Sequence, residues 1–137
     1  MSAAMRAANL YQQVELNSSV DSANKHQLIQ MLFDGLVSSL VAAEHHIQQT
    51  NLSAKSKSIS RACQILMGLQ TSLDHKNGGE IARNLGDLYD YASRRLVRAN
   101  IDNDASIVAE VRSLLTQIKE AWETVPEALK TQQFSRA

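Results

Sequence analysis

Four stretches of this sequence place apolar residues three and four positions apart, and no segment of useful length alternates with a period of two. Spacing of three and four puts side chains on one face of an α-helix, whereas a half-buried strand requires strict alternation. The stretches cover residues 23–49, 52–74, 79–101 and 104–125. The pattern therefore predicts an all-α chain with four amphipathic helices, each roughly 30–40 Å long.

One arc of each helix is expected to face a shared core. On the first two helices the arc consists of Leu28, Ile29, Leu32, Leu36, Leu40, Ala43 and Ile47, then Ile59, Ala62, Cys63, Leu66 and Leu73. On the last two it consists of Ile81, Leu85, Leu88, Ala92, Leu96 and Ala99, then Ile107, Val111, Leu114, Leu115, Ile118 and Trp122. A chain of 137 residues is long enough for one such core and too short for two.

Short polar breaks separate the four helices. Between the first two, Asn51 or Ser53 can accept the hydrogen bonds of an N-cap. The segment 75–79 is expected to end the second helix with a glycine in the left-handed conformation, and 102–104 to open the fourth with negative charge. Because short links make consecutive helices antiparallel, the sequence predicts an up-down-up-down four-helix bundle.

Three regions are expected along the chain. Residues 1–22 form a polar N-terminal segment whose apolar residues, Tyr11 and Val14 among them, suit a short element partly docked on the bundle. Residues 23–125 form the bundle itself. Residues 126–137 form a flexible polar tail, which begins with the proline that ends the fourth helix.

Composition and charge argue against several classes of protein. Fourteen basic residues balance fourteen acidic ones, whereas a nucleic-acid-binding protein usually carries a basic excess. No run approaches the roughly 18 apolar residues of a membrane span, and the N-terminus has no apolar signal region. The single cysteine, Cys63, cannot form an internal disulfide, which suits a reducing compartment. The sequence predicts a cytoplasmic protein that binds no nucleic acid and spans no membrane.

No catalytic, metal or cofactor site is expected. His45 and His46 are adjacent, so they point about 100° apart on a helix and cannot readily share one ion. A di-iron site in a bundle needs Glu-x-x-His pairs on two helices, and the sequence contains none. Cys63 falls on the core arc as a small hydrophobic residue, and Gly78-Gly79 suits a turn. We expect a protein that is not an enzyme.

Apolar residues outside the core arcs permit two interpretations. Ile65 and Leu69 lie together on the flank of the second helix. Tyr91 lies at an edge of the third helix's apolar stripe, and Val97 points away from that stripe. The first helix is widened in the same way by Met31, Val37 and Val41. Bundle helices touch two neighbours and can need wide apolar faces, or these residues can line grooves for an apolar partner.

A basic cluster, formed by Arg94, Arg95 and Arg98, lies on the third helix. Such a cluster is commonly a solvated face. The other interpretation is a clamp for the carboxylate of an acidic partner.

Several short motifs follow one another along the chain. They are Tyr11-Gln-Gln-Val14, the stretch 26–35 (HQLIQMLFDG), the stretches 78–85 (GGEIARNL), 88–91 (LYDY) and 95–100 (RLVRAN), and Ala121-Trp122. Each is weak alone, but in this order and spacing the chain resembles the FliS family of flagellin-specific export chaperones over residues 7–125. Asn24 stands where that family often has a proline, which alters helix capping and not packing.

The resemblance implies an antiparallel helical bundle that binds the disordered C-terminal segment of flagellin in the cytoplasm. Such a chaperone prevents premature polymerisation and assists export through the flagellar type III secretion system. The flagellar export gate and an anti-sigma factor are further implied partners.

The resemblance also implies an N-terminal segment that can occupy a groove later used by cargo, with Tyr11 and Val14 as a displaceable lid. The helical wheel suggests the remaining cargo contacts, with Arg95 as a polar anchor. The candidate flagellin-binding residues are Tyr11, Val14, Ile65, Leu69, Tyr91, Arg95 and Val97.

The alternative is a histidine phosphotransfer domain, which is also a four-helix bundle, or another helical-bundle regulator. Phosphotransfer needs an exposed histidine in the middle of a helix. His26 is expected at a helix start and His75 in a turn, so both are poorly placed for that chemistry.

Overall fold

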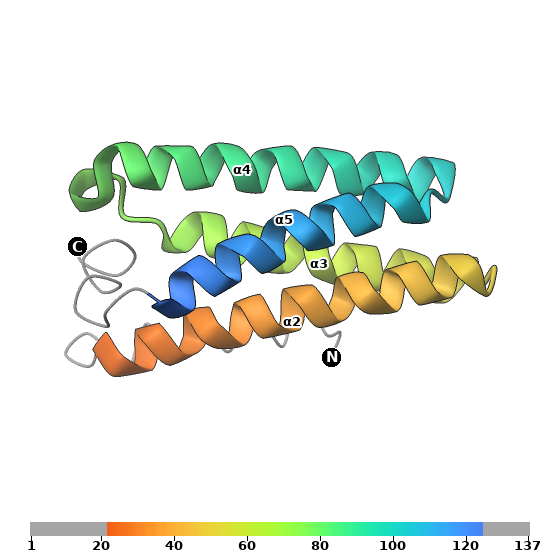
Figure 1. Ribbon diagram of the computed structural model, residues 1–137, viewed down its shortest axis with the longest axis horizontal. Coiled ribbons are helices and arrows are strands. Elements are labelled where there is room, and N and C mark those ends of the chain that lie inside the picture. The colour runs from red at the N-terminus through yellow and green to blue at the C-terminus, as the bar shows by residue number, and fades with distance from the viewer. Residues whose placement is uncertain (1–21, 125–137) are drawn as a thin grey trace.

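The computed structural model describes residues 22–124, and in that range it contains helices and no strand. The helices are α2 (Ser22–Gln48), α3 (Leu52–Ser72), α4 (His75–Asp102) and α5 (Ala105–Thr124). Consecutive helices run antiparallel along one long axis (Figure 1). Helix α2 packs against α3 and α5, and α4 packs against the same two helices. The predicted up-down-up-down four-helix bundle is confirmed.

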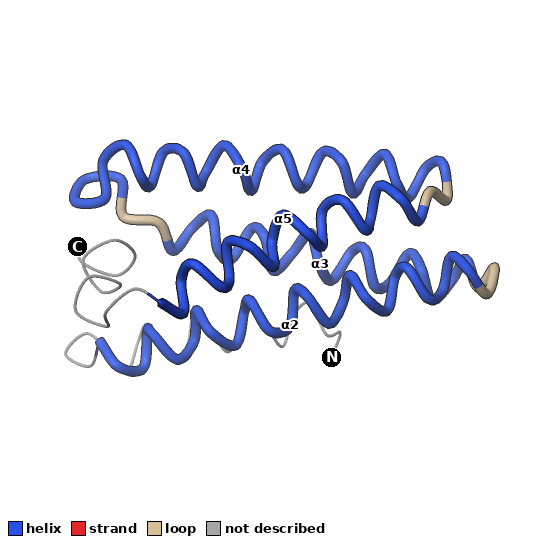
Figure 2. The backbone as a smooth tube through the Cα atoms, viewed as in Figure 1, coloured by secondary structure: helices blue, strands red, loops and turns tan. Residues whose placement is uncertain are grey.

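The loops are short (Figure 2), and side chains close the helix ends beside them. Asn51 is the N-cap of α3, because its Oδ1 accepts the backbone N–H of Ala54 at 3.2 Å. At the start of α5, Asp104 Oδ1 accepts the backbone N–H of Ser106 at 2.9 Å. Both contacts satisfy a backbone donor that a helix leaves free in its first turn. The predicted openings of these two helices are confirmed.

The segment 75–79 is not the loop that the sequence suggested. Helix α3 already ends at Ser72, and α4 begins at His75 after the N-cap Asp74. One turn later the backbone breaks at Gly79, with φ 51° and ψ −124°, before the helix continues. Glycine takes this conformation without a Cβ penalty. The left-handed glycine was therefore predicted correctly, but its role as a helix C-cap was wrong.

Most of the predicted core arcs are buried between the four helices. The largest fully buried side chains are Tyr89, Phe33, Leu36, Leu40, Leu66, Leu69, Leu96, Leu115, Val108 and Val111. Six predicted core residues are only partly buried. Ile47, Cys63, Leu85, Leu114 and Ile118 pack against the margin of the core, and Leu88 lies outside the core cluster. Ile81 was placed in the core wrongly: its side chain is 51% exposed, and the neighbouring Ala82 takes the inward position just after the Gly79 kink.

Aromatic rings close the end of the bundle where α2 begins and α5 ends. The rings of His26 and Trp122 lie 5.3 Å apart, and those of Phe33 and Trp122 lie 6.3 Å apart. His26 is thus half-buried against α5, and His75 is exposed at the first residue of α4. Within residues 22–124, no helix has both the length and the hydrophobicity to cross a bilayer.

Candidate functional site

Two of the proposed cargo contacts lie in the core. Ile65 and Leu69 are exposed by 2% and 0%, so their predicted place on an open flank is wrong. Helix α3 packs against both α2 and α4, and its buried arc is correspondingly wide. Ile65 fills the α2 side of that arc, where its Cδ1 lies 3.4 Å from the position a Cβ would take at Gly35. The wide-face interpretation holds for this pair.

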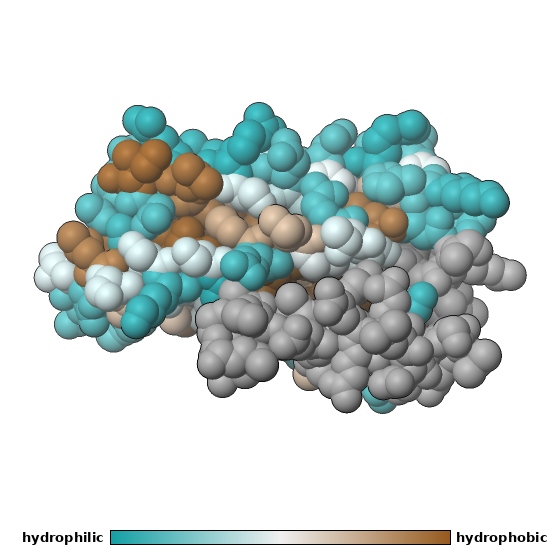
Figure 3. Space-filling model, turned by 180° about the vertical axis from the view of Figure 1, so that it is seen from behind, coloured by the Kyte–Doolittle hydropathy of each residue, from teal (hydrophilic) through white to brown (hydrophobic). Residues whose placement is uncertain are grey.

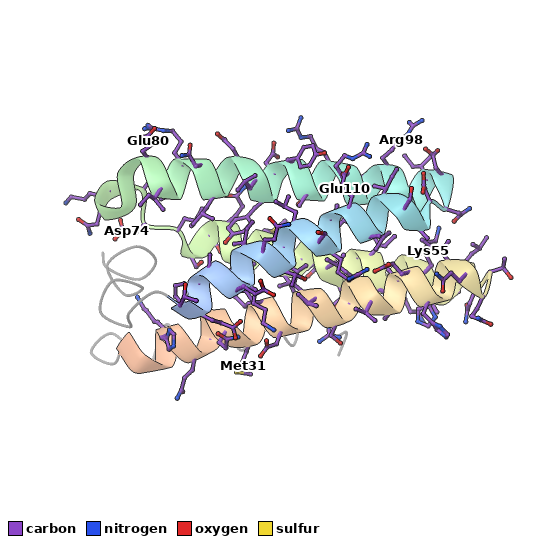
Figure 4. All side chains as sticks on the ribbon, in the orientation of Figure 1. Met31, Lys55, Asp74, Glu80, Arg98 and Glu110 are labelled. Atoms are coloured by element: carbon purple, nitrogen blue, oxygen red, sulfur yellow. The ribbon has the colours of Figure 1, made fainter. Side chains whose placement is uncertain are left out.

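Tyr91 and Arg95 lie together on the side of α4 that faces α5. The Tyr91 hydroxyl and the Arg95 Nε both donate to Glu110 Oε1, each at 3.1 Å (Figure 4 labels Glu110). The hydrogen bond with Glu110 raises the pKa of Arg95. Tyr91 remains 39% exposed, so its ring is available at the surface while its hydroxyl is fixed.

Val97 belongs to a different flank of α4. It is 55% exposed and lies on the side of α4 that carries Asn100, whose backbone oxygen accepts a hydrogen bond from Lys55 on α3. The structure therefore does not bring Val97 and Tyr91 together. Tyr11 and Val14, the proposed lid, lie outside the described residues.

The basic cluster on α4 is neutralised by carboxylates of the same chain. Arg94 pairs with Asp90 at 3.2 Å, and Arg98 pairs with Asp102 at 2.8 Å, both one turn apart on exposed surface. Arg98 points away from the bundle (Figure 4). With Arg95 held by Glu110, this arrangement favours the solvated-face interpretation over a clamp that stands open for a partner.

Ion pairs also join α5 to α2. Arg112 pairs with Glu44, its Nη2 lying 3.2 Å from Oε1, and Lys119 Nζ lies 3.0 Å from Asp34 Oδ1. The hydrogen bonds that Arg112 and Lys119 donate to these carboxylates raise the pKa values of both cations. The two surface seams beside α5 are thus closed by charged pairs.

The seam between α3 and α4 is held by hydrogen bonds, and no ion pair among residues 22–124 crosses it. Gln70 Nε2 donates to the Gly86 oxygen at 2.9 Å, and a Cβ at Gly86 would lie only 3.1 Å from Gln70 Oε1. At the other end Lys55, 5% exposed, donates to Asn100 O at 2.9 Å and to Asn103 Oδ1 at 2.6 Å (Figure 4). Sequence analysis missed this buried lysine, because a lysine in a serine-rich stretch suggests solvent.

Exposed apolar side chains gather along this seam. They form what we name the α3/α4 apolar flank, which consists of Leu52 and Met67 on α3 and Val97 and Ile101 on α4, exposed by 49%, 65%, 55% and 66%. Helical spacing places Leu52 and Met67 on the side of α3 that carries Ser56 and Gln70, and it places Val97 and Ile101 on the side of α4 that carries Asn100. All four therefore border the same seam. Figure 3 shows hydrophobic surface over the C-terminal end of α4, at the upper left.

Val97 was the only member of this flank that we proposed from the sequence. Ile101 lies one helical turn after Val97, so spacing could have found it. Met67 and Leu52 could not be found in this way, because the sequence does not show which side of α3 faces α4.

Titratable groups offer little chemistry in the described part of the chain. No group of three histidine, cysteine or acidic residues is placed there to hold a metal ion. Cys63 is half-buried, and desolvation raises the pKa of its thiol. A raised pKa keeps the thiol protonated and unreactive near neutral pH.

Comparison with known proteins agrees with the resemblance that the motifs suggested. The family described as flagellar protein FliS matches residues 7–129. The flagellar secretion chaperone FliS of Salmonella typhimurium is 49% identical over 116 residues, covering 84% of this chain and 86% of its own length. FliS of Escherichia coli is 42% identical over 120 residues (87% and 88% coverage), and FliSB of Pseudomonas aeruginosa 40% over 122 residues (89% and 97%). Matched over most of its length by the family and by these relatives, the chain belongs to the FliS family of flagellar proteins.

Proposed function

We propose that this chain is a cytoplasmic chaperone of flagellar secretion. It binds the disordered C-terminal segment of flagellin, prevents premature polymerisation and assists export through the flagellar type III system. The observation that carries the proposal is the family match over residues 7–129, together with relatives named flagellar secretion chaperones. As a chaperone, it acts by binding and release and needs no catalytic residue.

The α3/α4 apolar flank supports this proposal physically. A disordered segment that folds on binding must bury enough apolar area to offset its ordering entropy. Exposed apolar residues that cluster on one face of a helical bundle can accept the apolar side of such a segment. We assign the cargo surface to this flank, including Val97, and to Tyr91 with Arg95. Ile65 and Leu69 support it from the core, and Tyr11 and Val14 form the displaceable lid.

Calorimetry with purified flagellin tests the function. Full-length flagellin and its isolated C-terminal segment should bind with similar affinity, and flagellin that lacks this segment should not bind. Binding should show a negative heat-capacity change, because apolar surface leaves water. Undiminished binding to the truncated flagellin would refute the proposed cargo site.

Further partners belong to the same proposal. The loaded chaperone is expected to meet the flagellar export gate, and the empty chaperone an anti-sigma factor. Pulldown of each purified partner with loaded and empty chaperone separates these two interactions.

A further inference from the structure

Arg61 on α3 is a half-buried arginine with no carboxylate partner in the described part of the chain. Six arginines lie within residues 22–124. Four of them form ion pairs, namely Arg94, Arg95, Arg98 and Arg112. Of the other two, Arg83 is exposed, whereas Arg61 is half-buried, and its Nε is shielded from solvent with no hydrogen-bond acceptor among the described residues.

The guanidinium of Arg61 lies across the seam between α3 and α2. Its Nη2 is 3.6 Å from the position a Cβ would occupy at Gly35 on α2, so this glycine leaves room for it. One turn before Gly35, on the same side of α2, Met31 is 53% exposed and points away from the bundle (Figure 4). A cation and an exposed apolar side chain therefore adjoin on this seam.

Charge on this seam has one sign. Helix α3 contains no acidic residue. Of its three cations, Lys55 is buried at the α3/α4 seam, which leaves Lys57 and Arg61. Lys57 lies one turn before Arg61 on the same side of the helix and is exposed. The acidic residues of α2 are committed elsewhere, because Asp34 and Glu44 pair with α5. The seam is thus complementary to a negatively charged partner.

We propose that Arg61 is a carboxylate-binding subsite. It receives an acidic side chain of the cargo segment where that extended segment continues from the α3/α4 apolar flank around α3 to the α2/α3 seam, with Met31 as the adjoining apolar contact. An arginine forks readily onto a carboxylate, and the pair strengthens as docking excludes water. Among the described residues Arg61 Nε has no acceptor and no carboxylate pairs with the guanidinium, so a carboxylate of the docking cargo would be its first charged partner. This proposal depends on the proposed chaperone function.

Calorimetry with the C-terminal segment of flagellin tests the subsite. Arg61→Gln should weaken binding about tenfold and reduce its dependence on salt, since a charged pair is lost. Its melting temperature should not fall, because no ion pair within the bundle is broken. Arg83→Gln is the matched control, since it removes an exposed arginine from α4, and it should leave affinity unchanged. Arg61→Lys should retain part of the affinity.

Variants of the cargo identify the partner and keep the proposal testable if Arg61 variants fold poorly. In each variant of the segment one acidic residue is neutralised, and the binding of that variant to the wild-type chaperone is measured. One such change should weaken binding about as much as Arg61→Gln, and a lysine there should restore binding to Arg61→Glu. If no neutralisation weakens binding, or if Arg61→Gln binds as the wild type does, the subsite is wrong. Failure of the wild type to bind flagellin at all would instead refute the chaperone function.

Discussion

Tyr89 carries a phenol into the middle of the bundle, where its side chain is fully buried and its hydroxyl has no hydrogen-bond partner among residues 22–124. Burial raises the pKa of Tyr89, because the anion has nothing to stabilise it there. A buried hydroxyl without a partner costs about 1–3 kcal/mol relative to one that is satisfied. The packed ring, rather than the hydroxyl, is what this position contributes.

Tyr89→Phe is therefore expected to keep the free energy of unfolding or to raise it by about 1 kcal/mol, because it removes the unsatisfied group and retains the ring. Urea unfolding of both proteins measures the change. A loss of more than about 1 kcal/mol would show that the hydroxyl has a partner in solution.

Asp74 links a single residue to the stability of a helix. Its Oδ1 accepts the backbone N–H groups of Lys76 and Asn77, each at 3.1 Å, and its Oδ2 accepts Asn77 Nδ2 at 2.9 Å. These hydrogen bonds, chiefly those from Asn77, lower the pKa of Asp74. A pKa lowered by folding means that the ionised cap stabilises the native state above the unfolded pKa, which is about 3.9.

The stabilisation by Asp74 should therefore be complete at neutral pH and disappear as pH falls below about 4. Asp74→Asn keeps a capping oxygen but cannot titrate, so it should reduce the loss of stability in acid. Asp104→Asn should act in the same way, because hydrogen bonds from Ser106 lower the pKa of Asp104. Urea unfolding across the acid range measures the free energy of unfolding of each variant. If the variant with both changes, Asp74→Asn and Asp104→Asn, keeps the pH dependence of the wild type, the prediction is wrong.

Helix α4 shows where a sequence pattern stops determining a structural element. Four helices and the caps at Asn51 and Asp104 could be predicted, because periodicity and capping are local. The turn after Asp74 could not, since two consecutive glycines indicate a loop more strongly than a kinked helix start. Ile65 was misplaced for another reason. A helical wheel shows direction around one helix, but the number of neighbours that the helix contacts depends on the whole bundle.

Gly79→Ala tests the kink of α4. The conformation at φ 51° and ψ −124° disfavours any side chain, although no atom lies within 4 Å of an added Cβ. Strain of this kind costs about 1–3 kcal/mol. The control is Gly68→Ala on α3, where an added Cβ makes ordinary contacts of 3.8 and 3.9 Å with Leu32. It should be neutral or stabilising, since alanine favours a helix. Equal effects of the two changes in urea unfolding would show that the kink is not strained.

The molecule as a whole distributes its charge unevenly. Among residues 22–124, ion pairs join α5 to both α2 and α4, and no ion pair joins α3 to α2 or to α4. Each exposed pair contributes at most about 1 kcal/mol, so their number says little about stability. Their placement matters more for recognition. The side of the bundle around α5 already has its charges paired, and the side around α3 presents apolar residues and cations that a partner can use.

Two double variants test this asymmetry together. Val97→Gln with Ile101→Gln changes only exposed side chains. It should therefore change the free energy of unfolding by at most about 0.5 kcal/mol per substitution and leave the melting temperature nearly unchanged. It should weaken binding of the flagellin segment at least about tenfold, or 1.4 kcal/mol, because the α3/α4 apolar flank loses its α4 half.

Ile65→Gln with Leu69→Gln places polar groups in the core and should unfold early. A binding defect in the second variant would follow from unfolding, whereas one in the first would locate the cargo. If the first variant binds as tightly as the wild type, cargo uses another side of the bundle.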